Sequence, residues 1–186
     1  IADNVLKECL EQDKTSRVAV EVMAAKDSIY VAGQITSNAK IDIEKIVREH
    51  LKKVGYDNEN LDIDYRTCKV LINITKQSND IYAIVGNKGA GDQGTVFGYA
   101  CNETEELMPL PIMVAKDLTN LLTYVRKNNI IKGLRPDGKS QVTVEYREDK
   151  PARIDYIIIS AQHLKEKDLE ELRKEIYEKV ILESKY

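Results

Sequence analysis

The sequence predicts an α+β protein in which antiparallel or mixed sheets carry helices on one face. Two observations predict this class. A pair of alternating strands and an amphipathic helix recur in both halves of the 186-residue chain. Strict strand–helix–strand alternation, which marks a doubly wound parallel sheet, is absent. We therefore expect two related layered units, over residues 1–92 and 93–186.

The first half opens with helical character over residues 1–12. Apolar residues then alternate with other residues over 17–24 and 28–36, which predicts two half-buried strands. The short link "AKD" between them predicts a hairpin. A third strand is expected over 66–75.

A helix is predicted between the hairpin and the third strand. The segment "IDIEKIVREHLKKVGY" places apolar residues and one histidine on a single face at helical spacing, and Gly55 ends it. That face consists of Ile43, Ile46, Val47, His50 and Val54.

The second half repeats the pattern with its order changed. The segment "PIMVAKDLTNLLTYVRKN" begins with Pro111 at a helix start. Its apolar stripe is Val114, Leu118, Leu121 and Val125. The segments "SQVTVEY" and "RIDYIIIS" are predicted strands. The last segment, "EKDLEELRKEIYEKVIL", is a predicted amphipathic helix whose inward side chains are Leu169, Leu172, Ile176 and Val180.

Composition excludes several classes of function. The net charge is −3 and no global basic surface is present, so a nucleic-acid partner is not expected. The sequence contains no run of eighteen apolar residues, so a membrane span is not expected. The three cysteines, Cys9, Cys68 and Cys101, are far apart and form no C-x-x-C pair, which argues against zinc. We expect a cytoplasmic protein.

The stretch "GAGDQG" at residues 89–94 fits the dinucleotide fingerprint G-x-G-x-x-G letter for letter. That fingerprint requires a helix directly after the last glycine. The residues that follow, 95–101, are β-branched and aromatic around Gly98, and they predict a strand instead. Asp92 within the glycines could hold an ammonium group or a metal ion, or it could be a solvated turn residue.

Two further segments carry candidate residues. "KQSND" ends a strand and leads into the glycine-rich loop, so Gln77 and Asp80 are candidates for a mobile lid, although turn chemistry also explains them. In "LRPDGKSQVTVEY" a predicted turn feeds a strand. Lys139 could place a charge on a phosphate, and plain hairpin chemistry explains the turn equally well.

The hairpin register suggests one more pair of candidates. If Ala24 pairs with Ile29, Glu21 and Gln34 share one face of the sheet, either as a site or as a wetted surface. His50 is expected at the edge of the core rather than as a ligand. For His163, at a strand end, the sequence does not decide between a structural role and a ligand role.

Taken together, these segments resemble the S-adenosylmethionine synthetase family, also called methionine adenosyltransferases. The stretch "GAGDQGTVFGYACNETEELMP" is similar to the family signature. The blocks "VAVE", "GQITS", "KQSNDI", "LRPDGKSQVTVEY" and "IISAQH" resemble the family's other blocks in the same order. The resemblance covers essentially the whole chain.

The resemblance implies a reaction, cofactors and partners. Methionine sulfur attacks C5′ of ATP, the triphosphate leaves, and it is then cleaved to diphosphate and phosphate. Mg²⁺ and K⁺ assist. The family's fold is three similar α+β units, intertwined, with active sites shared across a homodimer or a dimer of dimers.

The resemblance also implies residue roles. Glu21 matches a K⁺ ligand. Gln77 matches a methionine contact at the start of a gating loop that includes Asp80, Gly86, Gly89 and Gly91. Asp92 matches the carboxylate that receives the methionine ammonium, and is expected to be catalytic with Lys139. Asp137, Gly138 and Lys139 match an ATP-binding turn.

The chain departs from the family in three places. Gln34 stands where the family has a glutamate that binds methionine. The block "SEGHPDK", with a catalytic histidine and an Mg²⁺-binding aspartate, is expected before Ile1, and the third unit after Tyr186. We therefore expect residues 1–186 alone to be inactive. The alternative function is a regulatory or structural partner of the same fold that has lost the chemistry.

Overall fold

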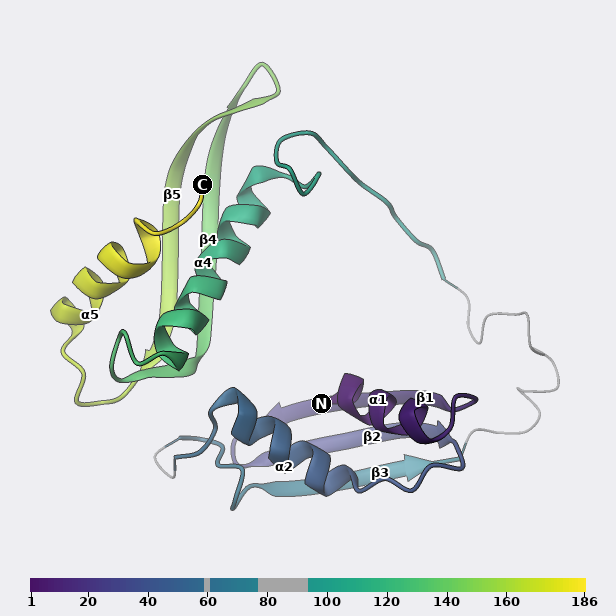
Figure 1. Ribbon diagram of the computed structural model, residues 1–186. Coiled ribbons are helices and arrows are strands. Elements are labelled where there is room, and N and C mark those ends of the chain that lie inside the picture. Colours follow the sequence, from purple (N-terminus) through teal and green to yellow (C-terminus); the bar gives the residue numbers. More distant parts are fainter. Residues whose placement is uncertain (59–60, 77–93) are drawn as a thin grey trace. The chain divides into compact units, whose positions relative to one another are not determined.

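The chain forms two compact units in a computed structural model that describes residues 1–58, 61–76 and 94–186. The units are Ile1–Thr95 and Val96–Tyr186. Each consists of a sheet with helices packed on it (Figure 1). The predicted α+β class is therefore confirmed. The predicted boundary between residues 92 and 93 lies outside the described residues.

The first unit is built on a mixed three-stranded sheet in the order β1-β2-β3. Strands β1 (Arg17–Ala25) and β2 (Ser28–Thr36) form the predicted antiparallel hairpin, and Ala24 pairs with Ile29 as expected. Strand β3 (Lys69–Thr75) runs parallel to β2. Helices α1 (Ala2–Gln12) and α2 (Ile43–Val54) complete the unit.

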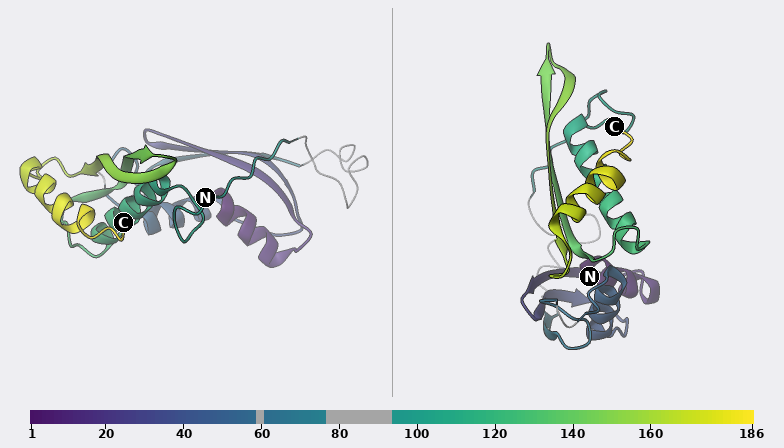
Figure 2. Two further views of the ribbon diagram at one scale, coloured as in Figure 1. Left: turned by 90° about the horizontal axis from the view of Figure 1, so that it is seen from above. Right: turned by 90° about the vertical axis from the view of Figure 1, so that its left-hand side faces the viewer.

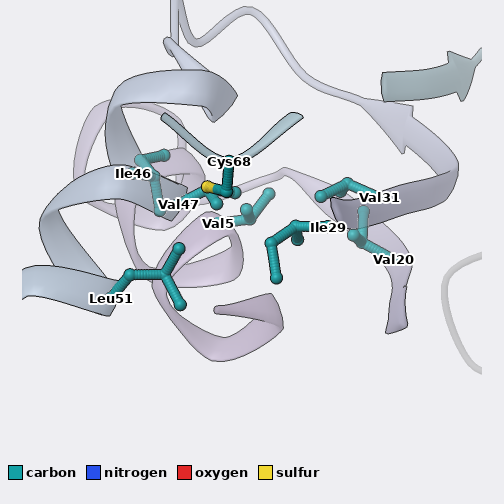
Figure 3. Packing of buried hydrophobic residues seen from close by; sticks show 8 residues of the cluster. All are labelled: Val5, Val20, Ile29, Val31, Ile46, Val47, Leu51 and Cys68. Carbon is teal, nitrogen blue, oxygen red and sulfur yellow. The ribbon is translucent and has the colours of Figure 1, made fainter. Parts of the chain in front are cut away.

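The core of the first unit lies between the sheet and these two helices (Figure 3). Alternate residues of the hairpin face inward because side chains alternate across a strand. The buried set is Val5, Val20, Ile29, Val31, Ile46, Val47, Leu51 and Cys68. Because α1 and α2 both pack on one side, no described element of this unit covers the other face of the sheet, which is called the open face below.

The predicted face of α2 needs one correction. Leu51 is buried, whereas Ile43, His50 and Val54 are only half buried. The apolar residues of α2 fit two overlapping helical stripes, and their spacing alone does not show which stripe is buried. The predicted end is confirmed, because Gly55 adopts a left-handed conformation (φ 109°) and its amide donates to the carbonyl of Leu51.

Strand β3 begins three residues later than predicted. Residues 65–67 form a turn fixed by the buried carboxylate of Asp64, which accepts hydrogen bonds from the Arg66 amide (2.8 Å) and guanidinium (2.9 Å). These bonds hold Arg66 in the turn and away from the strand ladder. They also lower the pKa of Asp64 to about 2.

The second unit packs two helices on one long hairpin. Strands β4 (Leu134–Arg147) and β5 (Lys150–His163) are antiparallel. Helix α4 (Leu110–Lys127) and helix α5 (Leu169–Ile176), which continues into a π-helix over Tyr177–Ile181, lie against the same face of the hairpin (Figure 2). Their common core contains Val114, Leu118, Leu122, Val125, Ile131, Leu134, Leu172 and Val180.

Three expectations for the second unit are wrong. Residues 95–101 are not a strand, because no neighbouring strand pairs with them among the described residues; their side chains from 95 to 100 are exposed. The Arg-Pro-Asp-Gly segment lies inside β4 rather than in a turn before it. Leu169 is 52% exposed, because it is the first residue of α5, directly after the N-cap Asp168.

Among the described residues, no helix combines the length and the apolar character that crossing a membrane would require.

Candidate functional site

The open face of the β1-β2-β3 sheet carries the first group of predicted site residues. In the register, Glu21 pairs with Ala32, which pairs with Asn73. Gln34 pairs with Ala19 on one side and Thr75 on the other. Residues paired across a sheet point to the same side, so Glu21 and Gln34 share one face as predicted.

Glu21 and Gln34 are both exposed. Neither side chain has a hydrogen-bond or ion-pair partner in the part of the chain that the structure describes. Their positions are diagonal across the hairpin, where side chains are about 7–8 Å apart. A ligand lying on this face can therefore reach both of them.

Two polar residues of β3, Asn73 and Thr75, lie on the same face and were not singled out from the sequence. Thr75 donates a hydrogen bond from Oγ1 to the Gly33 carbonyl at 3.4 Å. The alternation of "LINIT" gives the face of each residue within β3. It does not show that β3 joins the hairpin, because that pairing is parallel and distant in sequence.

Gly33 fixes how closely the strand before Gln34 approaches β1. Its φ is +146°, and a Cβ atom there would lie 2.1 Å from the carbonyl oxygen of Ala19. Only glycine fits this combination of conformation and contact. Gln34 directly follows this close approach of the two backbones.

The fit of this face to a monovalent cation rests on one carboxylate. Glu21 offers oxygen ligands that are not engaged by any cation of the described residues. Within residues 1–58, 61–76 and 94–186, no three His, Cys, Asp or Glu side chains are grouped as a metal site would need. Glu21 thus offers one carboxylate on this face, and no described residue is assigned to Mg²⁺.

The second group of predicted residues lies in a bulge of β4. Leu134 pairs with His163, and the next pair is Gly138 with Ala161. Three residues of β4 (135–137) therefore lie opposite one residue of β5 (162), and the extra residues bend the strand. The bulge contains Asp137 and precedes Lys139, and both side chains are exposed.

Side-chain contacts hold this bulge in place. Lys139 Nζ donates to both carboxylate oxygens of Asp137, at 2.8 and 2.7 Å. A Cβ atom on Gly138 would lie 3.4 Å from a methyl group of Leu122 on α4, so the backbone is close to the helix. Ser140 donates to the Ala115 carbonyl at 2.6 Å. Asp137 in the bulge and Lys139 after it present one carboxylate and one ammonium to solvent.

Each of the two histidines has a polar contact within its own unit. The side-chain amide nitrogen of Asn4 lies 3.0 Å from Nδ1 of His50, and burial lowers the pKa of His50. His163 Nδ1 lies 2.8 Å from the Leu164 carbonyl. These contacts support a structural role for His50, as expected.

The remaining predicted site residues fall outside the described part of the chain. They are Gln77, Asp80, Gly86, Gly89, Gly91 and Asp92. Glu21 and Gln34 belong to the first unit, and Asp137, Gly138 and Lys139 belong to the second.

Comparison with protein families matches both units. Residues 1–79 match the N-terminal domain of S-adenosylmethionine synthetase, and residues 87–185 match its central domain. The second match alone spans more than half of the chain. The chain belongs to the S-adenosylmethionine synthetase family, as the sequence blocks indicate.

Curated relatives carry the same name. The chain is 46% identical over 189 residues to the S-adenosylmethionine synthase of Desulfosudis oleivorans, covering 98% of this chain and 49% of the relative. The corresponding protein of Syntrophobacter fumaroxidans is 44% identical over 188 residues (97% and 48%). That of Brachyspira hyodysenteriae is 45% identical over 196 residues (98% and 50%). The chain thus spans about half the length of these relatives.

Proposed function

We propose that this chain is part of a methionine adenosyltransferase, which forms S-adenosylmethionine from ATP and methionine and releases phosphate and diphosphate. One observation carries the proposal: two family domains match in succession, and relatives named S-adenosylmethionine synthase are 44–46% identical across nearly the whole chain. The exposed groups on the two units are of the types that such substrates need.

The proposed roles divide between the units. Gln34, Gln77 and Asp92 bind methionine, and the Asp92 carboxylate receives its ammonium group. A thioether is a weak neutral nucleophile, so holding it in line with C5′ of ATP supplies much of the rate. Asp137 and Gly138 contact ATP. Lys139 places its ammonium where the charge of the leaving triphosphate grows.

The proposed cofactors are Mg²⁺ and K⁺. When bound, Mg²⁺ neutralises charge on the triphosphate, which is the chemistry that a polyphosphate leaving group requires. Glu21 supplies one carboxylate ligand to K⁺ on the open sheet face. These assignments follow from the family membership together with the free carboxylate of Glu21.

The proposed assembly is a homodimer. The open sheet face of the first unit exposes Met23 (60%), Tyr30 (39%) and Leu71 (47%), which is more apolar surface than a solvated face needs. The hairpin of the second unit likewise exposes Tyr156 and Ile158. A second copy would cover such faces and complete sites shared between subunits.

The experiment is an assay of S-adenosylmethionine formation by the full-length protein with ATP, methionine, Mg²⁺ and K⁺. We expect turnover that needs both substrates and both cations. A full-length protein that binds a catalytic subunit but forms no product itself would replace this proposal with the alternative, a regulatory or structural partner. Gln34 is the observation that favours that alternative, because it keeps the shape of glutamate and lacks its charge.

A further inference from the structure

Thr75 is the direct neighbour of Gln34 across the pairing of β2 with β3 (Figure 1). Neighbouring strands are about 4.7–4.9 Å apart, and paired side chains point to the same side of the sheet. Both side chains are exposed on the open face, and Gln34 makes no hydrogen bond within the described residues. The amide group of Gln34 can therefore reach the hydroxyl of Thr75 by rotation of its own side chain.

The hydroxyl of Thr75 already uses its only proton. Oγ1 donates it to the Gly33 carbonyl at 3.4 Å. This hydrogen bond is long, but among the described residues the hydroxyl has no other acceptor. A hydroxyl has one proton and two lone pairs, so Thr75 Oγ1 is left as an acceptor toward Gln34.

The amide group of Gln34 has two different ends. Nε2 donates two hydrogen bonds, whereas Oε1 only accepts. An acceptor on β3 favours the orientation in which Nε2 faces Thr75. That orientation turns Oε1 away from β3, toward Glu21 and any ligand that lies on the open face. A carboxylate at the same position would need no such selection, because both of its oxygens accept.

Two other side chains of this face lie within reach of the Gln34 amide. The carboxylate of Glu21, diagonal to Gln34, would accept from Nε2 if it were free. Glu21 is the proposed K⁺ ligand, however, and a bound cation favours Oε1 rather than Nε2 on that side. Asn73, one pair along β3, has both a donor and an acceptor, so it selects neither end of the amide.

We propose that Thr75 is a positioning residue for methionine, which holds the amide nitrogen of Gln34 so that Oε1 accepts from the ammonium group of the substrate. This role rests on the proposed function, in which Gln34 binds methionine. It explains how a neutral glutamine serves at a position where either oxygen of a carboxylate would accept. Without the hydroxyl, Gln34 can turn its NH₂ group toward the ammonium, where two donors oppose each other.

The test compares threonine variants of the full-length protein in methionine binding and in turnover. Thr75→Val keeps the shape of the side chain and removes the hydroxyl. We expect the Kd for methionine in calorimetry, and its KM at saturating ATP, to rise about three- to tenfold, as for one lost neutral hydrogen bond, while kcat changes less than about twofold. Thr75→Ser keeps the hydroxyl and should restore both constants. Thr143→Val, the same change at an exposed threonine of β4, is the control.

A Gln34→Glu background separates positioning from a general effect of Thr75 on the sheet. Because both carboxylate oxygens accept, adding Thr75→Val to Gln34→Glu should change the Kd for methionine by less than about twofold. An equal rise in the two backgrounds would overturn the positioning role. So would a folded Thr75→Val protein with the same Kd and KM as the Thr143→Val control.

The outcome for the proposed function is measured separately. A protein that binds methionine in a Thr75-dependent way but forms no S-adenosylmethionine would keep the positioning role and favour the regulatory alternative. Turnover that Thr75→Val leaves unchanged would keep the enzyme and remove the positioning role. Absence of both methionine binding and turnover would remove both. Should Thr75→Val fail to fold, Thr75→Ala decides, because it also lacks the hydroxyl.

Discussion

The ammonium of Lys139 lies 2.7 and 2.8 Å from the two carboxylate oxygens of Asp137, across the bulge of β4. The two side chains are 68% and 53% exposed. Such a solvent-exposed pair contributes only about 0–1 kcal/mol to stability. The contact therefore orients the ammonium without locking it.

Replacing this lysine should affect ATP more than methionine. In the full-length protein we expect Lys139→Met to raise the KM for ATP by about tenfold or more and to lower kcat, because a charge contact to the leaving triphosphate is lost. The melting temperature should change little. Lys150→Met, at the far end of the hairpin, is the control. Equal ATP kinetics in the two variants would remove Lys139 from the site.

Gln34 allows a test in which function is gained. Gln34→Glu adds a carboxylate of the same shape to the open sheet face, so we expect the KM for methionine to fall by about fivefold or more. Asn73→Asp makes the same chemical change on the neighbouring strand and should have a smaller effect. If both substitutions act alike, general charge on the face is responsible, and Gln34 has no specific role.

Asp92 should matter for methionine in particular. A hydrogen bond between an ammonium group and a carboxylate is worth about 1.5–3 kcal/mol. Asp92→Asn should therefore raise the methionine requirement roughly ten- to a hundredfold while the fold stays intact. Steady-state kinetics at saturating ATP measure this effect. Unchanged methionine kinetics would make Asp92 a solvated turn residue.

Gly33→Ala should destabilise the first unit. A methyl group there meets the Ala19 carbonyl, and alanine resists a φ of +146°. Overpacking and backbone strain each cost about 1–3 kcal/mol, so we expect a loss of at least about 2 kcal/mol in urea unfolding. Gly98→Ala is the control, because no atom lies within 4 Å of its added methyl. Similar losses in both variants would contradict this explanation.

The pKa of Asp64 predicts how the stability of the first unit changes as the pH falls. Its hydrogen bonds from Arg66 hold its pKa at about 2 when folded, below its usual value near 3.9. The unfolded chain therefore binds more protons between pH 4 and pH 2, and stability falls as the pH drops through that range. Asp64→Asn should flatten this part of the curve of unfolding free energy against pH. The exposed Asp62→Asn is the control and should leave the slope in place.

Much of the fold could be predicted because its signals are local. The β1-β2 register follows from alternation and a short turn, and it correctly placed Glu21 and Gln34 on one face. Helix α4 follows from a single apolar stripe that begins at a proline. Such signals need only a few neighbouring residues, so one sequence contains them.

The errors occur where contacts between residues that are far apart in the sequence determine the structure. Residues 95–101 have the composition of a strand, but a strand also needs a partner, and none pairs with them in the described residues. The bulge in β4 depends on how Leu134 and Gly138 meet His163 and Ala161, which local pattern cannot show.

The parallel pairing of β2 with β3 has a consequence for the order of folding. The β1-β2 hairpin closes a tight turn, and hairpins form in about 1–10 μs. Ser28 can pair with Lys69 only after residues 37–68, with α2 among them, have crossed over the sheet. Closing that long connection costs chain entropy before any stabilising contact of β3 has formed, and this slows folding. The third strand, which brings Asn73 and Thr75 beside Gln34, should therefore dock last, so the open face is completed only at the end of folding.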